Sequence, residues 1–198
     1  MKQVIVIHGG TTFEKYDDYM ASLTSKSIYP ERMTFKPLWK ERLQASLGDE
    51  CSVLLPTMPN KTNARYAEWK LWFDNISRIL ENDCILVGHS MGAIFLAKYL
   101  SQNTLDVRIK GTILVATPYD DESVEDLTDF KLDSISDLFT SQAGDVYIIN
   151  GNDDPVISHA DIQKYKHDLP RAQFITVSAP DHFMRESFPE LLEIISAI

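Results

Sequence analysis

The sequence predicts an α/β protein, a three-layer α/β/α sandwich built on a mostly parallel sheet of six strands. Short apolar runs, typical of strands buried on both faces of a sheet, recur six times in the 198 residues. Stretches with helical spacing separate these runs, as parallel strands require, because the chain must cross over before each new strand. A single domain over residues 1–198 is expected. A chain of this length buries roughly 70% of its unfolded surface on folding, which is enough for one sizeable core.

The predicted elements alternate regularly along the chain. The first strand runs directly into His8-Gly9-Gly10, as a buried strand followed by a tight loop would. The predicted strands are Gln3–Ile7, Cys51–Leu55, Cys84–Val87, Ile109–Ala116, Val146–Ile149 and Gln173–Val177. The predicted helices are Tyr16–Leu23, Leu38–Leu47, Ala64–Leu80, Met91–Ser101, His159–His167 and Phe188–Ala197.

Residues 120–143 interrupt this alternation. The segment lies between two predicted strands, is longer than a plain crossover, and has Lys131 as the only basic residue among many aspartates and glutamates. Its apolar positions could line one side of short helices. Two interpretations stay open: a small cap over the ligand-binding edge of the sheet, or a solvated acidic excursion.

Composition excludes several classes of function. The formal net charge of −10 disfavours binding to nucleic acid or anionic lipid, because both depend on clustered lysine and arginine. No stretch approaches the roughly 20 apolar residues that a membrane span needs, so no membrane span is predicted. The apolar start is too short for a secretory signal, which predicts a cytoplasmic protein. Cys51 and Cys84 each open a predicted strand and are expected to be buried thiols, not a disulfide or a zinc site.

Residues 88–92, Gly-His-Ser-Met-Gly, place Ser90 between an apolar strand and an apolar helix. This is the strand-turn-helix context in which the G-x-S-x-G motif presents a nucleophilic serine. Gly88 and Gly92 each lie two residues from the serine, where a larger side chain would collide with the other position or with neighbouring strands. Ser90 is therefore the candidate nucleophile.

A serine nucleophile needs a base and a carboxylate to orient that base. His182 follows the last predicted strand and is the only histidine at a strand end after the candidate acids. Asp153 and Asp154 follow the fifth strand, and either could reach it. Asp154 is favoured because Pro155 fixes the chain after it, which leaves Asp153 to stabilise the turn by bonding its own backbone.

The oxyanion of an acyl-transfer reaction needs backbone N–H donors. Met91 begins the helix after Ser90, so its N–H is one candidate. The second should come from the loop after the first strand, where Gly10 is preferred and Thr11 is the alternative. His8, in the same loop, is expected to hold the loop by hydrogen bonds and not to act as the base.

With serine, aspartate and histidine in this order, the chain resembles the α/β-hydrolase superfamily over nearly its whole length. The G-H-S-M-G, D-D-P and D-H-F segments are similar in particular to the small serine hydrolases grouped with retinoblastoma-binding protein 9. That resemblance implies Ser90, Asp154 and His182 as the triad. It also implies a sheet of six strands, because the chain starts directly at the strand that bears His8 and Gly9.

The predicted activity is hydrolysis of a small-molecule carboxylic ester or thioester through an acyl-enzyme on Ser90, with no metal or organic cofactor. Two alternatives use the same scaffold. One is a catalytically silent module that binds a protein partner, and the other is an acyltransferase or peptidase with the same triad. The sequence does not identify the substrate.

Overall fold

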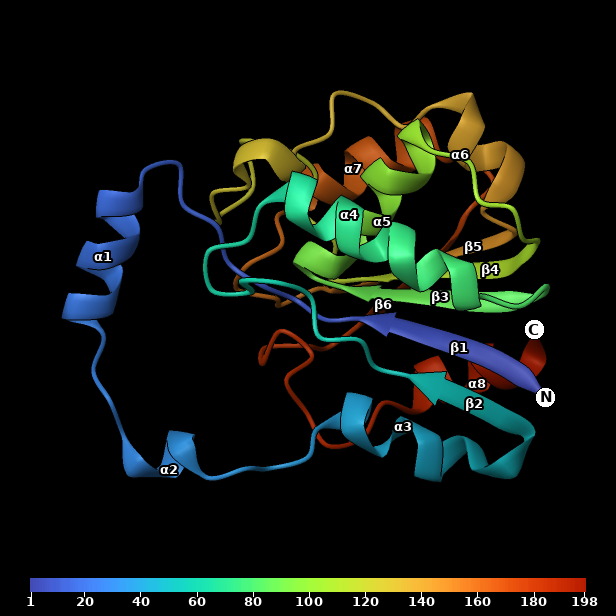
Figure 1. Ribbon diagram of the computed structural model, residues 1–198, viewed down its shortest axis with the longest axis horizontal. Helices are drawn as coiled ribbons and strands as arrows, with labels where there is room; N and C mark the ends of the chain where they lie inside the picture. Colours follow the sequence, from blue (N-terminus) through green and yellow to red (C-terminus); the bar gives the residue numbers. More distant parts are fainter.

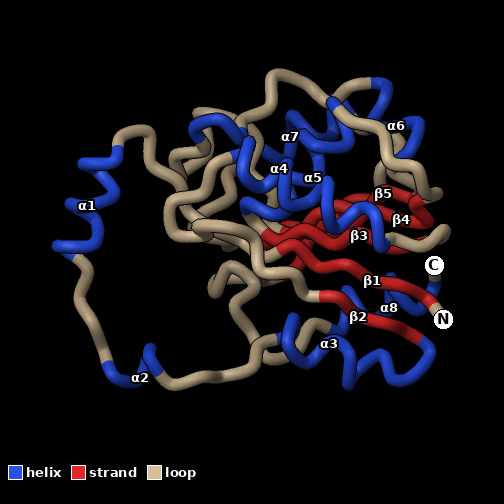
Figure 2. Tube along the Cα trace, viewed as in Figure 1, coloured by secondary structure: helices blue, strands red, loops and turns tan.

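A computed structural model describes the backbone of residues 1–198 and the side chains of all residues except 31 and 32. Six strands form one sheet in the order β2-β1-β3-β4-β5-β6, and each pair of neighbours is parallel (Figures 1 and 2). The strands are β1 (Lys2–Ile7), β2 (Cys51–Leu54), β3 (Cys84–His89), β4 (Ile109–Val115), β5 (Asp145–Gly151) and β6 (Gln173–Val177). The predicted six-stranded parallel sheet is confirmed.

Helices cover both faces of this sheet, which gives the predicted three layers (Figure 1). One face carries α3 (Trp39–Leu47) and α8 (Pro189–Ala197), which contact each other, and η1 (Gly48–Glu50) follows α3. The other face carries α4 (Tyr66–Ile76) with η2 (Ser77–Ile79), α5 (Met91–Gln102), α6 (Asp137–Gln142) and α7 (His159–Asp168). The helix predicted over residues 64–80 is shorter than expected and ends in a 3-10 turn.

The centre of the sheet is fully buried. Every residue of β3 is buried between β1 and β4, which explains its nearly unbroken apolar run. Above it, Phe95 of α5 makes T-shaped contacts with Trp69 and Phe73 of α4 at ring-centroid distances of 5.6 and 5.5 Å. This aromatic packing supports the helix that begins at the candidate nucleophile.

One predicted helix does not join the core. The helix α1 (Tyr16–Ser25) has no buried residue, and together with α2 (Pro30–Met33) it stands away from the sheet (Figures 1 and 2). Helical spacing predicted α1 correctly but not α2. Apolar periodicity marks a helix that can pack against something, and in this chain the apolar side chains of α1 find no core to cover.

Residues 120–143 form η3 (Thr128–Phe130) and α6, joined by irregular chain. Leu127, Phe130 and Phe139 are buried in the main core, and α6 packs against α5. Ion pairs tie the acidic start of the segment to α7, where Lys164 Nζ lies 2.5 Å from an Asp120 oxygen. A role as a cap over the site stays a prediction.

Both cysteines are buried free thiols, as predicted, and burial raises the pKa of Cys84 to about 11. No helix within the described chain is long and apolar enough to cross a membrane.

A buried carboxylate joins α7 to the chain that follows β4. Asp161 is fully buried and accepts hydrogen bonds from the backbone N–H of Tyr119 and Ser158 and from the hydroxyls of Ser123 and Ser158, at 2.5 to 2.9 Å. Four donors meet two acceptor oxygens, so the charge is fully compensated where no water reaches it.

Replacement of Asp161 by Asn is expected to lower the free energy of unfolding by about 2 to 3 kcal/mol, because an amide N–H₂ would then face donors in a buried site. Urea denaturation measures the change. Asp106→Asn, at an exposed position, is the matched control and is expected to stay within about 0.5 kcal/mol of wild type. Equal stability of the two variants would contradict this assignment.

Candidate active site

Ser90 occupies a sharp turn between β3 and α5. Its φ of 54° and ψ of −123° lie in a region that non-glycine residues rarely adopt, and such strain gathers at functional sites. Its N–H donates to the Val115 carbonyl at 2.8 Å. A Cβ on Gly88 would lie 2.5 Å from Ala93 Cα, and one on Gly92 would collide with the carbonyl oxygen of Ile7. Positions 88 and 92, each two residues from Ser90, therefore have room only for glycine.

The structure brings His182 and Asp154 together. His182 lies in the loop after β6 with a φ of 51°, and its Nδ1 is 2.9 Å from each carboxylate oxygen of Asp154. The Asp154 side chain is fully buried, and that of His182 is 16% exposed. Because Nδ1 is engaged by a carboxylate, Nε2 is the ring nitrogen left for proton transfer.

Asp154, not Asp153, is the aspartate that faces His182. The Asp154 carboxylate also accepts the N–H groups of Val156 and Ile157, so it holds its own turn. We expected Asp153 to stabilise the turn by bonding its own backbone; it does interact with its own backbone, but the later N–H groups of the turn bond Asp154. Asp153 also reaches the next loop, accepting the Ser178 hydroxyl at 2.7 Å and the Ala179 N–H at 2.5 Å. Both aspartates therefore bond the loop after β6, but at different residues.

Ser90 and His182 line the same cavity, which has a volume of about 460 Å³. No hydrogen bond joins Ser90 Oγ to His182 among the described residues. Such bonds are often long in a free enzyme and tighten when substrate binds. The cavity lies at the carboxyl ends of β1, β3 and β6, where open parallel sheets bind ligands.

Two backbone N–H groups beside Ser90 have no acceptor in the described chain. They belong to Gly10, which lines the cavity, and to Met91, in the first turn of α5. The two residues are neighbours, since a Cβ on Gly10 would lie 3.5 Å from Met91 Sδ. The alternative donor, Thr11, already donates its N–H to the Lys61 carbonyl at 2.9 Å. Free N–H groups close to a serine can stabilise a developing oxyanion.

His8 holds two loops together, as expected. Its Nδ1 is 2.6 Å from the Gly9 carbonyl, and its Nε2 accepts the Met58 N–H at 2.8 Å. Nδ1 must therefore carry the proton. Burial lowers the pKa of His8, which favours this neutral form.

A buried lysine beside the nucleophile escaped prediction. Lys40 of α3 is 8% exposed, and its Nζ lies 3.0 Å from His89 Nδ1. An ammonium can only donate, so Nδ1 accepts and His89 Nε2–H donates to the His182 carbonyl at 3.0 Å. Burial, reinforced by the charge of Lys40, holds the pKa of His89 well below its usual value. Burial also lowers the pKa of Lys40, to about 8.

Comparisons with known proteins identify the family of the chain. A family model described as serine hydrolase matches residues 36–196, which is most of the chain. The chain belongs to the serine hydrolase family. No curated protein sequence matches this serine hydrolase.

Solved structures similar to this serine hydrolase are α/β hydrolases. The ydeN gene product of B. subtilis has a TM-score of 0.73 at 20% identity, and the match covers 100% of this chain and 98% of that one. The thioesterase domain from the curacin biosynthetic pathway has a TM-score of 0.65 at 12% identity, covering 100% and 91%. The Pyrococcus furiosus esterase Pf2001 has a TM-score of 0.56 at 15% identity, covering 99% and 82%. At these identities the likeness shows the fold.

Three further basic residues, Lys61, Arg65 and Arg185, have different surroundings. Lys61 lines the Ser90 cavity of the serine hydrolase. Arg65 and Arg185 have structural partners instead: Arg65 donates to the Phe13 carbonyl at 2.7 Å, and Arg185 pairs with Asp181. No group of three or more His, Cys, Asp or Glu residues in the described chain could hold a metal ion.

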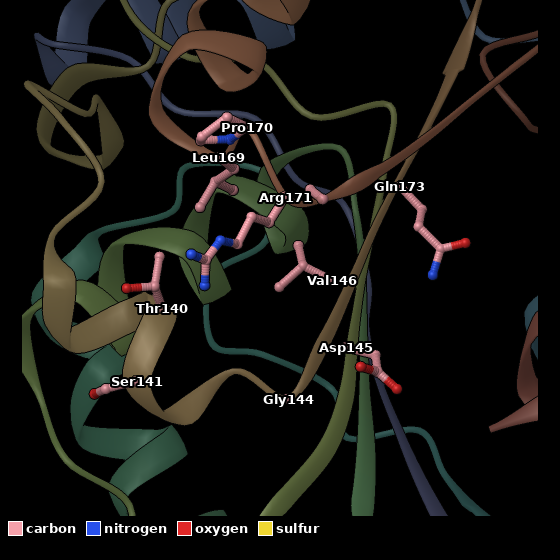
Figure 3. Close-up of a pocket in the computed structure, with 10 residues that line it drawn as sticks. Thr140, Ser141, Gly144, Asp145, Val146, Leu169, Pro170, Arg171 and Gln173 are labelled. Atoms are coloured by element: carbon pink, nitrogen blue, oxygen red, sulfur yellow. The ribbon is translucent and has the colours of Figure 1, made fainter.

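A second cavity of about 450 Å³ lies at the opposite end of the sheet, where β5 and β6 begin (Figure 3). Thr140, Ser141, Asp145 and Arg171 are among its lining residues. It contains no histidine to activate a serine, so the Ser90 cavity is the candidate active site of the serine hydrolase.

The burial of Lys40 predicts how the stability of the protein changes with pH. Its pKa is about 8 in the folded protein and near 10.5 when unfolded, so the cost of burying its charge fades as pH rises through this interval. The free energy of unfolding of wild type, relative to Lys40→Met, is therefore expected to increase from pH 8 to pH 10.5. Urea denaturation across this range measures it. Lys110→Met, at an exposed position on β4, should parallel wild type. A Lys40→Met curve that also ran parallel would contradict the assignment.

Proposed function

We propose that this serine hydrolase cleaves a small-molecule carboxylic ester or thioester through an acyl-enzyme on Ser90. One observation carries the proposal: a histidine bonded at Nδ1 to a buried aspartate opens onto the same cavity as a strained serine. Of the candidate residues, this combination supplies a nucleophile, a base and an orienting acid in the order Ser, Asp, His.

The proposed mechanism begins with proton transfer from Ser90 Oγ to His182 Nε2 as Oγ attacks the ester carbonyl. The N–H groups of Gly10 and Met91 stabilise the oxyanion of the tetrahedral intermediate. When that intermediate collapses, His182 returns the proton to the departing alcohol or thiol. Water then attacks the acyl-enzyme, gives its proton to His182, and releases the acid with Ser90 restored. Asp154 orients the imidazole and stabilises its charged form throughout.

Several observations favour an ester-type substrate and the finer family placement. Similar structures include proteins named as a thioesterase domain and as esterases, although at low identity. The segments around Ser90, Asp154 and His182 support placement near the retinoblastoma-binding protein 9 group. Two buried free thiols support a reducing compartment such as the cytoplasm.

A fluorophosphonate probe is expected to label the native protein, and Ser90→Ala should abolish the labelling because the attacking oxygen is gone. Gel fluorescence and mass spectrometry of the labelled peptide measure this. Ser178→Ala removes an exposed hydroxyl after β6 and should be labelled like wild type. Labelling that persists in Ser90→Ala would overturn the proposed nucleophile. A folded wild-type protein that is inert to the probe and to esters would favour the protein-binding alternative.

The two aspartates form a matched pair for a second test. Asp154→Asn is expected to lower kcat by about 10³- to 10⁴-fold, because the amide no longer orients and stabilises the imidazolium. Asp153→Asn removes the same charge one residue away and should cost less than about tenfold. Steady-state hydrolysis of p-nitrophenyl esters measures both. Equal losses in the two variants, or a larger loss in Asp153→Asn, would reject Asp154 as the acid.

A further inference from the structure

The Ser90 cavity collects positive charge in a protein whose net charge is −10. Lys26, Lys40 and Lys61 line it, and none of them forms an ion pair with a described carboxylate within 4.0 Å. Lys26 and Lys61 are exposed, whereas Lys40 is buried. Burial lowers the pKa of Lys40, and the charge of the neighbouring Glu41 partly offsets this effect, but the two side chains form no ion pair. A buried charge without a bonded partner is costly, so Lys40 needs an explanation that the triad does not supply.

The hydrogen bonds of Lys40 are incomplete. An ammonium has three donors, and the only acceptor that Lys40 reaches among the described residues is His89 Nδ1 at 3.0 Å. A contact with the face of the Trp39 ring, 5.0 Å from the centroid, adds attraction but accepts no conventional hydrogen bond. Because Lys40 lines the cavity, its remaining donors are available to a ligand there. Since its pKa is about 8, most of the side chain stays charged at neutral pH.

Lys40 also lies close to the reaction centre. A Cβ on Gly9 would lie 3.2 Å from Ser90 Cβ and 3.5 Å from His89 Nδ1, the atom that Lys40 contacts. Gly9 therefore packs against both Ser90 and the His89 ring nitrogen that Lys40 contacts. A substrate bound at Ser90 could extend one of its ends to the Lys40 ammonium.

Two glutamates also line the cavity, Glu41 next to Lys40 in α3 and Glu125 in the segment after β4. Half-buried Glu125 interacts electrostatically with His182 and Asp154, so it marks the side of the cavity that the base occupies. The Glu41 carboxylate accepts the Leu38 N–H at 2.9 Å, which closes the start of α3. Three lysines and two glutamates therefore line the cavity, and no described carboxylate lies within 4.0 Å of Lys40 Nζ.

We propose that the substrate of this hydrolase carries a carboxylate, which the ammonium of Lys40 binds, with Lys61 adding positive charge at the rim. The proposal rests on the proposed ester hydrolysis at Ser90 and specifies its substrate class. A carboxylate fits better than a phosphate because one buried cation balances one charge, whereas phosphate sites usually combine several N–H donors or arginines.

The test compares two esters of nearly equal shape. Mono-p-nitrophenyl adipate ends in a carboxylate, and p-nitrophenyl 6-oxoheptanoate carries an acetyl group in its place. At pH 7 wild type is expected to have a higher kcat/KM for the anionic ester. Lys40→Met should lower the ratio of the two kcat/KM values by about tenfold to a hundredfold, the effect of a hydrogen bond between charged groups. The homologous pimelate and suberate pairs cover other distances from Ser90.

Two further variants serve as controls. Lys110→Met removes an exposed lysine of β4 at a distance from the cavity and should leave the ratio unchanged. Lys40→Arg keeps the charge and should retain a preference for the anionic ester. If Lys40→Met does not fold, an experiment on wild type still tests the proposal. Adipate should slow labelling of wild type by the fluorophosphonate probe, whereas the same concentration of adipamide at equal ionic strength should not.

The outcomes separate this proposal from the proposed function. Equal kcat/KM values for the two esters in wild type, together with normal labelling, overturn the carboxylate proposal and leave ester hydrolysis standing. A Lys40→Met ratio equal to that of wild type shows that Lys40 only positions His89, which also overturns it. A wild-type protein that is not labelled and hydrolyses neither ester removes the proposed function, and this proposal with it.

Discussion

Gly92 lies so close to the carbonyl oxygens of Ile7 and His8 that no side chain fits between them. This contact lets α5 begin directly against the end of β1, and Ser90 is then held in a strained turn over the sheet. Met91, the first residue of α5, lies beside the loop that carries Gly10, since a Cβ on Gly10 would be 3.5 Å from Met91 Sδ. The geometry around the candidate nucleophile thus depends on glycine at both position 88 and position 92.

The remaining parts of the site depend on buried charge. The Asp154 carboxylate holds both its own turn and the ring of His182, so the loops after β5 and β6 are tied together. His89 binds the His182 backbone carbonyl and is itself bound by Lys40, which joins α3 to the same loop. These contacts are largely shielded from water, so each hydrogen bond is stronger than at the surface. For the same reason, a polar group left without its partner there would cost more stability.

The sequence predicted the sheet well because parallel strands buried on both faces leave long apolar runs, as in residues 84–87. It also located the candidate site residues, since the chemistry requires particular residue types at strand ends. It failed where the partner of a side chain lies far away in the chain. The bonds of Asp153 to the loop after β6 depend on how two loops meet, and local turn chemistry does not contain that information.

Lys40 was missed for a different reason. Its spacing with Leu43 and Leu47 places it on the buried stripe of its helix, and this signal was present in the sequence. Lysine is seldom buried, so a lysine at such a position is easily taken for a surface residue. The exposed apolar residues of α1 are the opposite case, because periodicity predicted a packed helix where the structure has no core.

The central claim is that Ser90 forms a covalent acyl intermediate. Rapid mixing of the protein with a p-nitrophenyl ester, followed by acid quench and peptide mass spectrometry, tests it most directly. The account predicts a burst of about one p-nitrophenol per protein and an acyl group on the peptide that contains Ser90. Turnover without any acylated peptide, or an acyl group on another residue, would contradict it.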